Sequence, residues 1–300
     1  MSLKQRLTPW MPPKLLNLGE AMVGKNSWLA VQGYLKGGQT PWSRGYTPYK
    51  KQFIGQALQN PELLEIFSQG KPLPQSYGYA LDERCVEYPW LFTHLPEAAK
   101  TILDAGSILN FPYLLDQPYF TDRQLHIVTL APEEESFWER EISYIFADLR
   151  ELPLRENYYD TVLCLSTLEH VGLDNRLYTR DNRYHESSAE DYKLAMEELS
   201  RVLKPGGSLF ISVPFGKYQN FAEFQQFDSA LLEKAIQAFG PAESVDKTFF
   251  RYTDQGWQIA TETECSNCEY MHWFLPTPEK PDAPDKAAAA RAVACVHIRR

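Results

Sequence analysis

The feature that most constrains this chain is a series of five short apolar runs that alternate with longer segments between residues 101 and 213. Such alternation is typical of a parallel sheet whose strands are joined by helices. We therefore expect strands at Thr101–Ala105, Leu125–Leu130, Ile142–Phe146, Thr161–Leu165 and Ser208–Val213.

The clearest helix lies before the last of these strands, in the sequence "SAEDYKLAMEELSRVL". Tyr192, Met196, Leu199 and Leu203 recur there at spacings of three or four, which predicts one apolar stripe facing the sheet. The following "KPGG" is expected to end the helix and to turn the chain into the strand.

The C-terminal part predicts a helix at Ser229–Phe239 and two more strands, "DKTFFRY" and "AVACVHIRR". Pairing of these two strands would give the sheet an antiparallel last strand. Residues 276–291 are rich in proline and alanine, so we expect an exposed loop with a short helix at the alanine run. The prediction for residues 96–300 is thus an α/β fold with a mostly parallel, Rossmann-like sheet and helices on both faces.

Residues 1–95 have a different texture and predict a helical and irregular N-terminal extension, or cap. A helix is expected over Gln52–Phe67 with a break at Asn60-Pro61, and a second helix over Leu81–Leu95. Two roles are open for this segment, covering an acceptor pocket or sealing the surface of the fold. The second is favoured.

Charge and cysteine content limit the possible partners. A net charge of −9 opposes a nonspecific grip on nucleic acid or anionic lipid, because these polyanions would be repelled. No apolar run reaches the roughly 18 residues of a membrane helix, and no signal peptide is recognisable. Five irregularly spaced cysteines fit a reducing compartment. We expect a cytoplasmic protein without nucleic-acid or membrane partners; the oligomeric state stays open.

In open parallel sheets, ligands bind beyond the carboxyl ends of the strands. The residues just after the strands are Asp104–Ser107, Thr129–Glu133, Ala147–Leu149 and Ser166–His170. The segments that contain most of them, or follow them in the chain, are "ILDAGSILN", "ADLRELPLRENYYDTVLCLSTLEHVG" and "AMEELSRVLKPGGSLFISVP". Together they resemble class I S-adenosylmethionine (SAM)-dependent methyltransferases of the type 11 group, over roughly Lys100 to Val213. "LDAGSILN", "TLAPE" and "STLEHVGLDN" are similar to a bacterial subset of that group. The resemblance implies SAM as cofactor and methyl transfer to an acceptor, with a small-molecule or glycan hydroxyl preferred.

The resemblance also implies where the cofactor would be held. Asp104 would support the first turn near the methionine amino group, Gly106 would allow close backbone approach, and Asp148 with the Leu149 backbone would contact the adenine. Leu130 and Leu149 could flank the adenine ring. The remaining candidate cofactor residues are Ser107, Asn110, Thr129 and Ser166.

Two departures from the family pattern stand out. Thr129 replaces the acid that holds the ribose hydroxyls, so Glu133 or Glu134 could take that role. Ile108, Leu109 and Asn110 replace the later glycines, which is tolerable for SAM but damaging for NAD, because only NAD carries a pyrophosphate. Asn110 could contact the methionine carboxylate or merely begin a helix. A nicotinamide-dependent oxidoreductase is therefore disfavoured, and the remaining alternative is a non-catalytic scaffold with the same fold.

His170 is the candidate catalytic base, since a histidine there could accept a proton from a hydroxyl acceptor; a structural role is equally open. Ser166 stands where metal-binding relatives have an acid, so no metal is expected beside it.

Cys265, Cys268 and His272 have the spacing of half a zinc site, although free thiols are favoured. The polar insert 172–190 could read an anionic acceptor or form a solvated loop. Its candidate contacts are Arg176, Arg180, Arg183 and His185.

Overall fold

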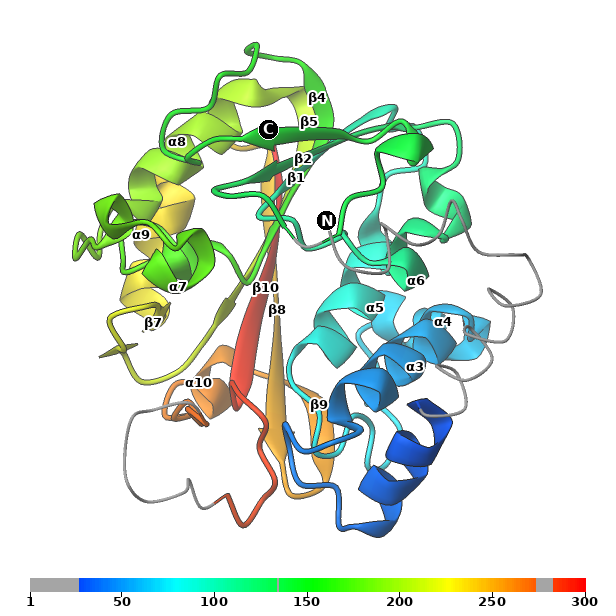
Figure 1. Ribbon diagram of the computed structural model, residues 1–300. Coiled ribbons are helices and arrows are strands. Elements are labelled where there is room, and N and C mark those ends of the chain that lie inside the picture. Colours follow the sequence, from blue (N-terminus) through cyan, green and yellow to red (C-terminus); the bar gives the residue numbers. More distant parts are fainter. Residues whose placement is uncertain (1–26, 134, 274–282) are drawn as a thin grey trace.

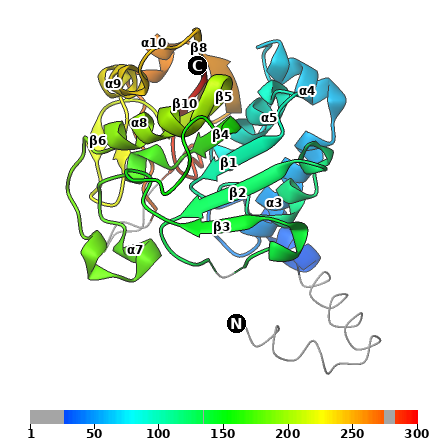
Figure 2. The ribbon, with the colours of Figure 1, turned by 90° about the horizontal axis from the view of Figure 1, so that it is seen from above.

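An eight-stranded sheet forms the centre of the computed structural model, which describes residues 27–133, 135–273 and 283–300. Its strand order is β3-β2-β1-β4-β5-β10-β8-β9 (Figure 2). All five strands predicted between residues 101 and 213 are confirmed. The bounds are β1 Thr101–Ala105, β2 Gln124–Thr129, β3 Ser143–Phe146, β4 Tyr159–Leu165, β5 Leu203–Pro214, β8 Ser244–Thr253, β9 Gly256–Ala260 and β10 Ala292–Arg299.

Strands β1 to β5 are parallel to one another, whereas β10 is antiparallel to both β5 and β8. Cys295 of β10 faces Ser212 on one side and Thr248 on the other. The predicted antiparallel last strand is therefore confirmed, as is its pairing with the "DKTFFRY" strand. A separate pair of two-residue strands, β6 Gln219–Asn220 and β7 Gln225–Gln226, lies outside the main sheet.

One face of the sheet is covered by α8 Tyr192–Val202 and α9 Ser229–Phe239 (Figure 1). Helix α8 buries Tyr192, Met196 and Leu199, as its periodicity predicted. Its end was predicted less well, because Leu203 is the first residue of β5 and "KPGG" lies within that strand, next to a shift in the β4–β5 register.

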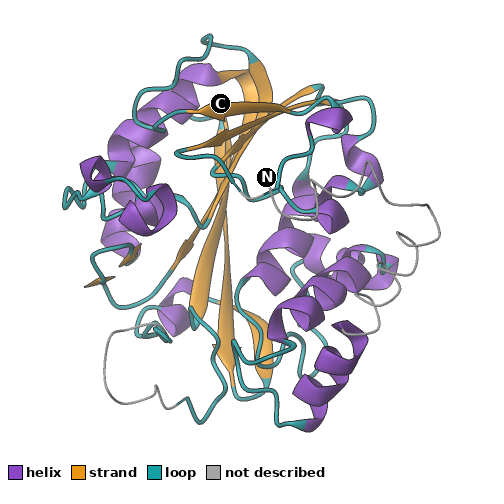
Figure 3. Ribbon diagram, in the orientation of Figure 1, coloured by secondary structure: helices purple, strands orange, loops and turns teal. Residues whose placement is uncertain are grey.

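The opposite face is covered by α3 Tyr46–Leu58, α4 Pro61–Ser68 and α5 Arg84–His94, which follow a helical stretch at 27–36 (Figure 3). The predicted break between α3 and α4 is confirmed: Pro61 opens α4, and the Asn60 side chain caps it by accepting from the Leu63 N–H. Tyr46 and Trp90 share a core with Phe210 of β5 and Cys295 of β10. This packing supports the favoured role of the N-terminal segment, sealing a surface of the fold.

These N-terminal helices replace the helices that normally connect consecutive parallel strands. The connection from β1 to β2 holds only α6 Pro112–Leu115 and a 3₁₀ turn at Pro118–Phe120, and that from β2 to β3 only a 3₁₀ turn at Trp138–Arg140. Parallel sheets need cover on both faces. The chain obtains that cover from residues that precede β1.

The alanine run was predicted wrongly. Residues 287–290 form no helix, and all four alanines are buried. The indole N–H groups of Trp42 and Trp273 donate to the carbonyls of Ala288 and Ala287, at 2.6 and 2.9 Å. The small alanine side chains let both indoles approach the backbone, so the two tryptophans hold this segment in place. The earlier part of the expected loop, 276–282, lies outside the described residues. Within the described ranges, no helix is long and apolar enough to cross a membrane.

Candidate functional site

The turn after β1 is shaped by a buried carboxylate. Asp104 is fully buried and accepts hydrogen bonds from the N–H groups of Ile108 (3.0 Å) and Leu109 (2.8 Å). Gly106 (φ 122°) and Ser107 (φ 61°) both have positive φ, which lets the chain reverse within these few residues. Burial raises the pKa of Asp104 to about 7, although the two N–H groups oppose that shift. The expected support of the turn by Asp104 is thus present in the structure.

Gly106 packs directly against the segment that follows β4. A Cβ atom on Gly106 would lie 2.2 Å from Oγ1 and 2.5 Å from Cγ2 of Thr167. The glycine is therefore required by this contact as well as by its φ. Beside it, the Ser107 hydroxyl is buried and has no hydrogen-bond partner among the described residues. An orphaned hydroxyl in this turn fits a polar group of a ligand held there.

Asn110 joins the first turn to the segment after β2. Its Nδ2 donates to Glu133 Oε2 (2.7 Å), and its Oδ1 accepts from the Tyr144 hydroxyl (2.7 Å). Because α6 begins at Pro112 with Phe111 as its N-cap, Asn110 does not cap that helix. Glu133 is therefore tied to the same turn, whereas Glu134 lies outside the described residues.

Thr129 is the last residue of β2, and its hydroxyl donates to the Ala131 carbonyl at 3.3 Å. Its oxygen can still accept a hydrogen bond. Leu130 next to it is half-buried, and Leu149, after β3, is buried.

Asp148 is held by an arginine that sequence analysis missed. Arg150 Nε and Nη2 donate to its two carboxylate oxygens at 3.0 and 2.7 Å. The same guanidinium contacts Glu186 (2.9 Å) and Asp191 (2.7 Å) of the insert. Burial would raise the pKa of Asp148, but the bonds from Arg150 outweigh it and lower that pKa. Arg150 thereby fastens the end of the insert to the end of β3.

Ser166 belongs to a second network that reaches helix α5. The hydroxyls of Ser166 and Ser212 both donate to Glu87 Oε1 at 2.6 Å, and Arg84 Nη1 donates to Glu87 Oε2 at 2.9 Å. Glu87 is fully buried. A fully buried carboxylate with three donors is satisfied, so Glu87 fixes α5 to the carboxyl ends of β4 and β5.

Glu169 and His170 follow within a 3₁₀ turn, Leu168–His170. His170 Nδ1 lies 2.9 Å from the Glu223 carbonyl. A carbonyl only accepts, so Nδ1 carries the proton and Nε2 keeps a free lone pair in the neutral ring. Burial lowers the pKa of His170 to about 4, which keeps the ring neutral near pH 7. The geometry suits a hydrogen-bond acceptor better than a strong base.

Two arginines of the insert, Arg176 and Arg183, are paired locally. Arg176 contacts Asp174 and Arg183 contacts Asp181, each at 2.6 Å, and His185 lies 3.1 Å from Asp174. These exposed pairs favour the interpretation as a solvated loop. Within the ranges that the structure describes, no three His, Cys, Asp or Glu side chains lie close enough together to bind a metal ion. This includes Cys265, Cys268 and His272, which do not form such a group.

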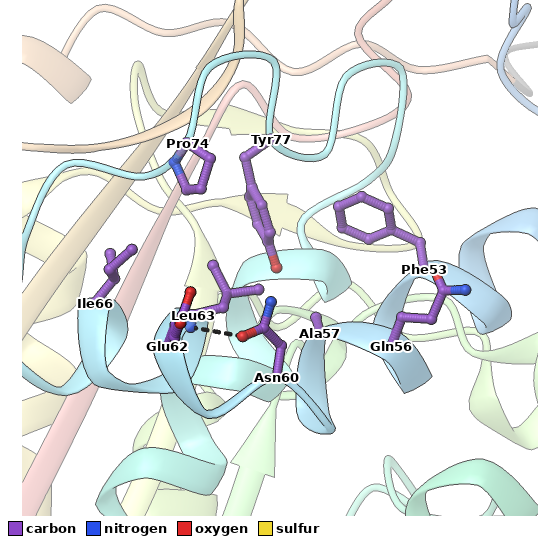
Figure 4. Close-up of a pocket in the computed structure, with 9 residues that line it drawn as sticks. All are labelled: Phe53, Gln56, Ala57, Asn60, Glu62, Leu63, Ile66, Pro74 and Tyr77. Carbon is purple, nitrogen blue, oxygen red and sulfur yellow. Dashed lines mark hydrogen bonds between the residues drawn. The ribbon is translucent and has the colours of Figure 1, made fainter.

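A surface cavity of about 330 Å³ lies elsewhere, between α3, α4 and the loop that carries Pro74 and Tyr77 (Figure 4). Its wall includes Asn60, whose side chain is already engaged in capping α4. It has no side chain in common with the strand ends described above.

The strand order, the antiparallel pairing of β10 with β5 and the turn after β1 define an α/β sheet of the Rossmann-like methyltransferase type. Residues 117–211 match a protein family described as a methyltransferase domain, and S-adenosylmethionine is the cofactor that this match indicates. No curated protein sequence matches the chain.

Several solved structures resemble the chain in outline. The 1,6-didemethyltoxoflavin-N1-methyltransferase of Burkholderia thailandensis, solved with S-adenosylhomocysteine, is 16% identical with a TM-score of 0.40, over 67% of this chain and 71% of that chain. The [4+2]-cyclase SpnF is 15% identical with a TM-score of 0.43, over 84% and 96%. A SAM-dependent methyltransferase from Archaeoglobus fulgidus is 13% identical with a TM-score of 0.44, over 74% and 96%. Likeness at this level carries no argument about activity.

Proposed function

We propose that this protein is a SAM-dependent methyltransferase whose cofactor lies at the carboxyl ends of β1 to β4. The observation that carries the proposal is the turn after β1 within the expected fold. Two consecutive positive φ angles there present a buried Ser107 hydroxyl for which the described residues supply no hydrogen-bond partner. When bound, SAM supplies a methyl carbon activated by its sulfonium. The protein's part is to orient the reactants and exclude water.

Individual residues would divide the work as follows. Asp104 keeps the turn in shape, and the Gly106 and Ser107 backbone lies against the methionine portion, with Ser166 behind it. Leu130 and Leu149 flank the adenine, and Asp148 accepts from the adenine amino group with the lone pairs that Arg150 leaves free.

The ribose would be held at Thr129 or by Glu133, and Asn110 would position Glu133 through their 2.7 Å hydrogen bond. His170 Nε2 would accept a hydrogen bond on the acceptor side. A cytoplasmic enzyme acting on a small molecule or glycan is supported by the net charge of −9 and by the five cysteines, all of them free.

A non-catalytic scaffold is the second candidate, and two observations favour it. The Thr167 side chain fills the space in front of Gly106, and Arg150 already occupies both oxygens of Asp148. This alternative predicts that the cleft is closed to a nucleoside.

Isothermal titration of SAM and S-adenosylhomocysteine into the purified chain separates the two candidates. The methyltransferase predicts binding of both, and loss of that binding in Leu130→Arg, which places a charged side chain against the adenine. Leu194→Arg, on the exposed side of α8, is the matched control and should bind normally. Absence of binding to the wild type would support the scaffold and refute the enzyme.

A further inference from the structure

Two carboxylates beside the strand ends, half-buried Glu83 and buried Glu169, lack an ion-pair partner in the part of the chain that the structure describes. Lys50 pairs with Asp82 (2.5 Å), and Arg84 pairs with Glu87 (2.9 Å). Glu83 and Glu169 make no ion pair within the described residues, and Oε2 of each is buried without a hydrogen-bond partner there. The Glu169 side chain belongs to a residue only 4% exposed.

A buried carboxylate without a partner is costly, so it either takes up a proton or holds a cation. Burial raises the pKa of Glu83 to about 8 and raises that of Glu169 well above its usual range. Burial also lowers the pKa of His170 and of His272, so both nearby histidines are neutral near pH 7 and supply no positive charge. The charge of Arg84 opposes both shifts, but Arg84 is already paired with Glu87. A further cation would therefore be needed to keep either carboxylate ionised near pH 7.

Aromatic rings stand around the same place. The Phe224 ring lies 5.7 Å from His170, 4.8 Å from Tyr270 and 5.5 Å from His272, between ring centroids. Burial, followed by the charges of Glu83 and Glu169, raises the pKa of Tyr270, so both carboxylates act electrostatically on its hydroxyl. Aromatic faces attract organic cations, whereas a metal ion would need a converging ligand set that the described residues do not provide.

This place adjoins the proposed cofactor turn. Thr167, which contacts the Gly106 position, precedes Glu169 by two residues in the segment after β4. Arg84, the N-terminal residue of α5, also approaches the Leu165 carbonyl at 3.5 Å, so the start of α5 lies beside the end of β4.

We propose that Glu83 and Glu169, together with the rings of Phe224 and Tyr270, bind the ammonium group of an amine, which is the methyl acceptor. This inference rests on the proposed methyltransferase function and replaces the hydroxyl acceptor preferred from the sequence. The ammonium gives one proton to a carboxylate, which becomes a neutral carboxyl group, and the nitrogen keeps the electron pair of the broken N–H bond. The amine is then nucleophilic.

The test uses matched amines and alcohols as probes. Benzylamine, phenethylamine and tryptamine, with benzyl alcohol, 2-phenylethanol and tryptophol, are titrated near neutral pH into the full chain saturated with S-adenosylhomocysteine. At least one amine should bind about tenfold or more tightly than its alcohol, because a charge-assisted contact is lost in the alcohol. Glu169→Gln and Glu83→Gln should each remove that preference. Glu156→Gln, an exposed carboxylate at the opposite end of the sheet, should not.

The outcomes distinguish this inference from the proposed function. Binding of S-adenosylhomocysteine with no bound amine, with equal affinity for amine and alcohol, or with an amine preference that survives both substitutions in folded variants overturns the ammonium site and leaves the methyltransferase standing. Tighter binding of an alcohol restores the hydroxyl acceptor. Failure of S-adenosylhomocysteine to bind refutes the proposed function itself.

Discussion

Substitution of Gly106 by alanine tests how closely the turn after β1 packs on the end of β4. The new Cβ would lie 2.2, 2.5 and 2.8 Å from Oγ1, Cγ2 and Cβ of Thr167, at a residue whose φ is 122°. Overpacking of this kind costs about 1–3 kcal/mol. The positive φ adds roughly another 1–3 kcal/mol for a residue with a side chain. The free energy of unfolding should therefore fall by roughly 2–6 kcal/mol.

A double-mutant cycle separates the two costs. Thr167→Ala removes Oγ1 and Cγ2, and with them the two closest contacts, but leaves the φ strain unchanged. In the Gly106→Ala background it should recover about 1–2 kcal/mol, whereas alone it destabilises through loss of its hydrogen bond to the Leu165 carbonyl. Gly55→Ala is the matched control, because no atom lies within 4 Å of its Cβ position in helix α3. It should stabilise by roughly 0.5–1 kcal/mol.

Urea unfolding followed by tryptophan fluorescence measures all four variants. Additivity of Gly106→Ala and Thr167→Ala within about 0.5 kcal/mol would mean that the two residues do not contact each other. That result would refute the closed packing described here, and with it the main observation that favours a scaffold.

Three further predictions concern single side chains. Arg150→Gln removes the hydrogen bonds to Glu186 and Asp191, so it should raise the rate of amide hydrogen exchange in residues 183–191 about tenfold or more. Arg155→Gln, at an exposed arginine, should leave that rate unchanged. Equal exchange rates in the two variants would show that Arg150 does not hold this segment. The pKa of His170 falls from 6.5 to about 4 on folding, so roughly 3 kcal/mol of stability is present above pH 6.5 and is lost as the pH falls through 4. His170→Asn should remove this part of the pH dependence of the free energy of unfolding. If the free energies of the wild type and of His170→Asn change in parallel between pH 4 and 6.5, the pKa of His170 is not lowered by folding. Thr129→Asp should raise the affinity for S-adenosylhomocysteine about tenfold if the ribose lies at the end of β2; an unchanged affinity in a folded variant would place the ribose elsewhere.

Local pattern was enough to predict the sheet. The strands at 101–165 are continuous apolar runs, and the Asn60-Pro61 pair combines a capping side chain with a residue suited to a helix start. Asp104 and Gly106 could be placed in the first turn for the same reason, because their roles depend on neighbours a few residues away.

The rest of the site depends on partners distant in sequence. Glu87 finds its donors at Ser166 and Ser212, which are 79 and 125 residues away, and Arg150 reaches Asp191, 41 residues away. The only local sign of the α5 network was a helix that carries Glu83, Arg84 and Glu87 among apolar residues. The alanine run misled for a related reason, since small apolar residues suit an exposed helix and a tightly covered loop equally well.

The cover of the sheet by helices α3 to α5 also bears on the order of events during synthesis. These helices precede the sheet in the chain, yet the core that they enter includes Val293 and Cys295 of β10, which follows them by about 200 residues. The hydrogen bond from Trp42 to the Ala288 carbonyl also joins residues 246 positions apart, so it can form only after Ala288 has been made. Because such long-range contacts form late, the apolar side of these helices stays open until β10 has been made. A ribosome-bound chain that does not yet include β10 should therefore be a client for chaperones.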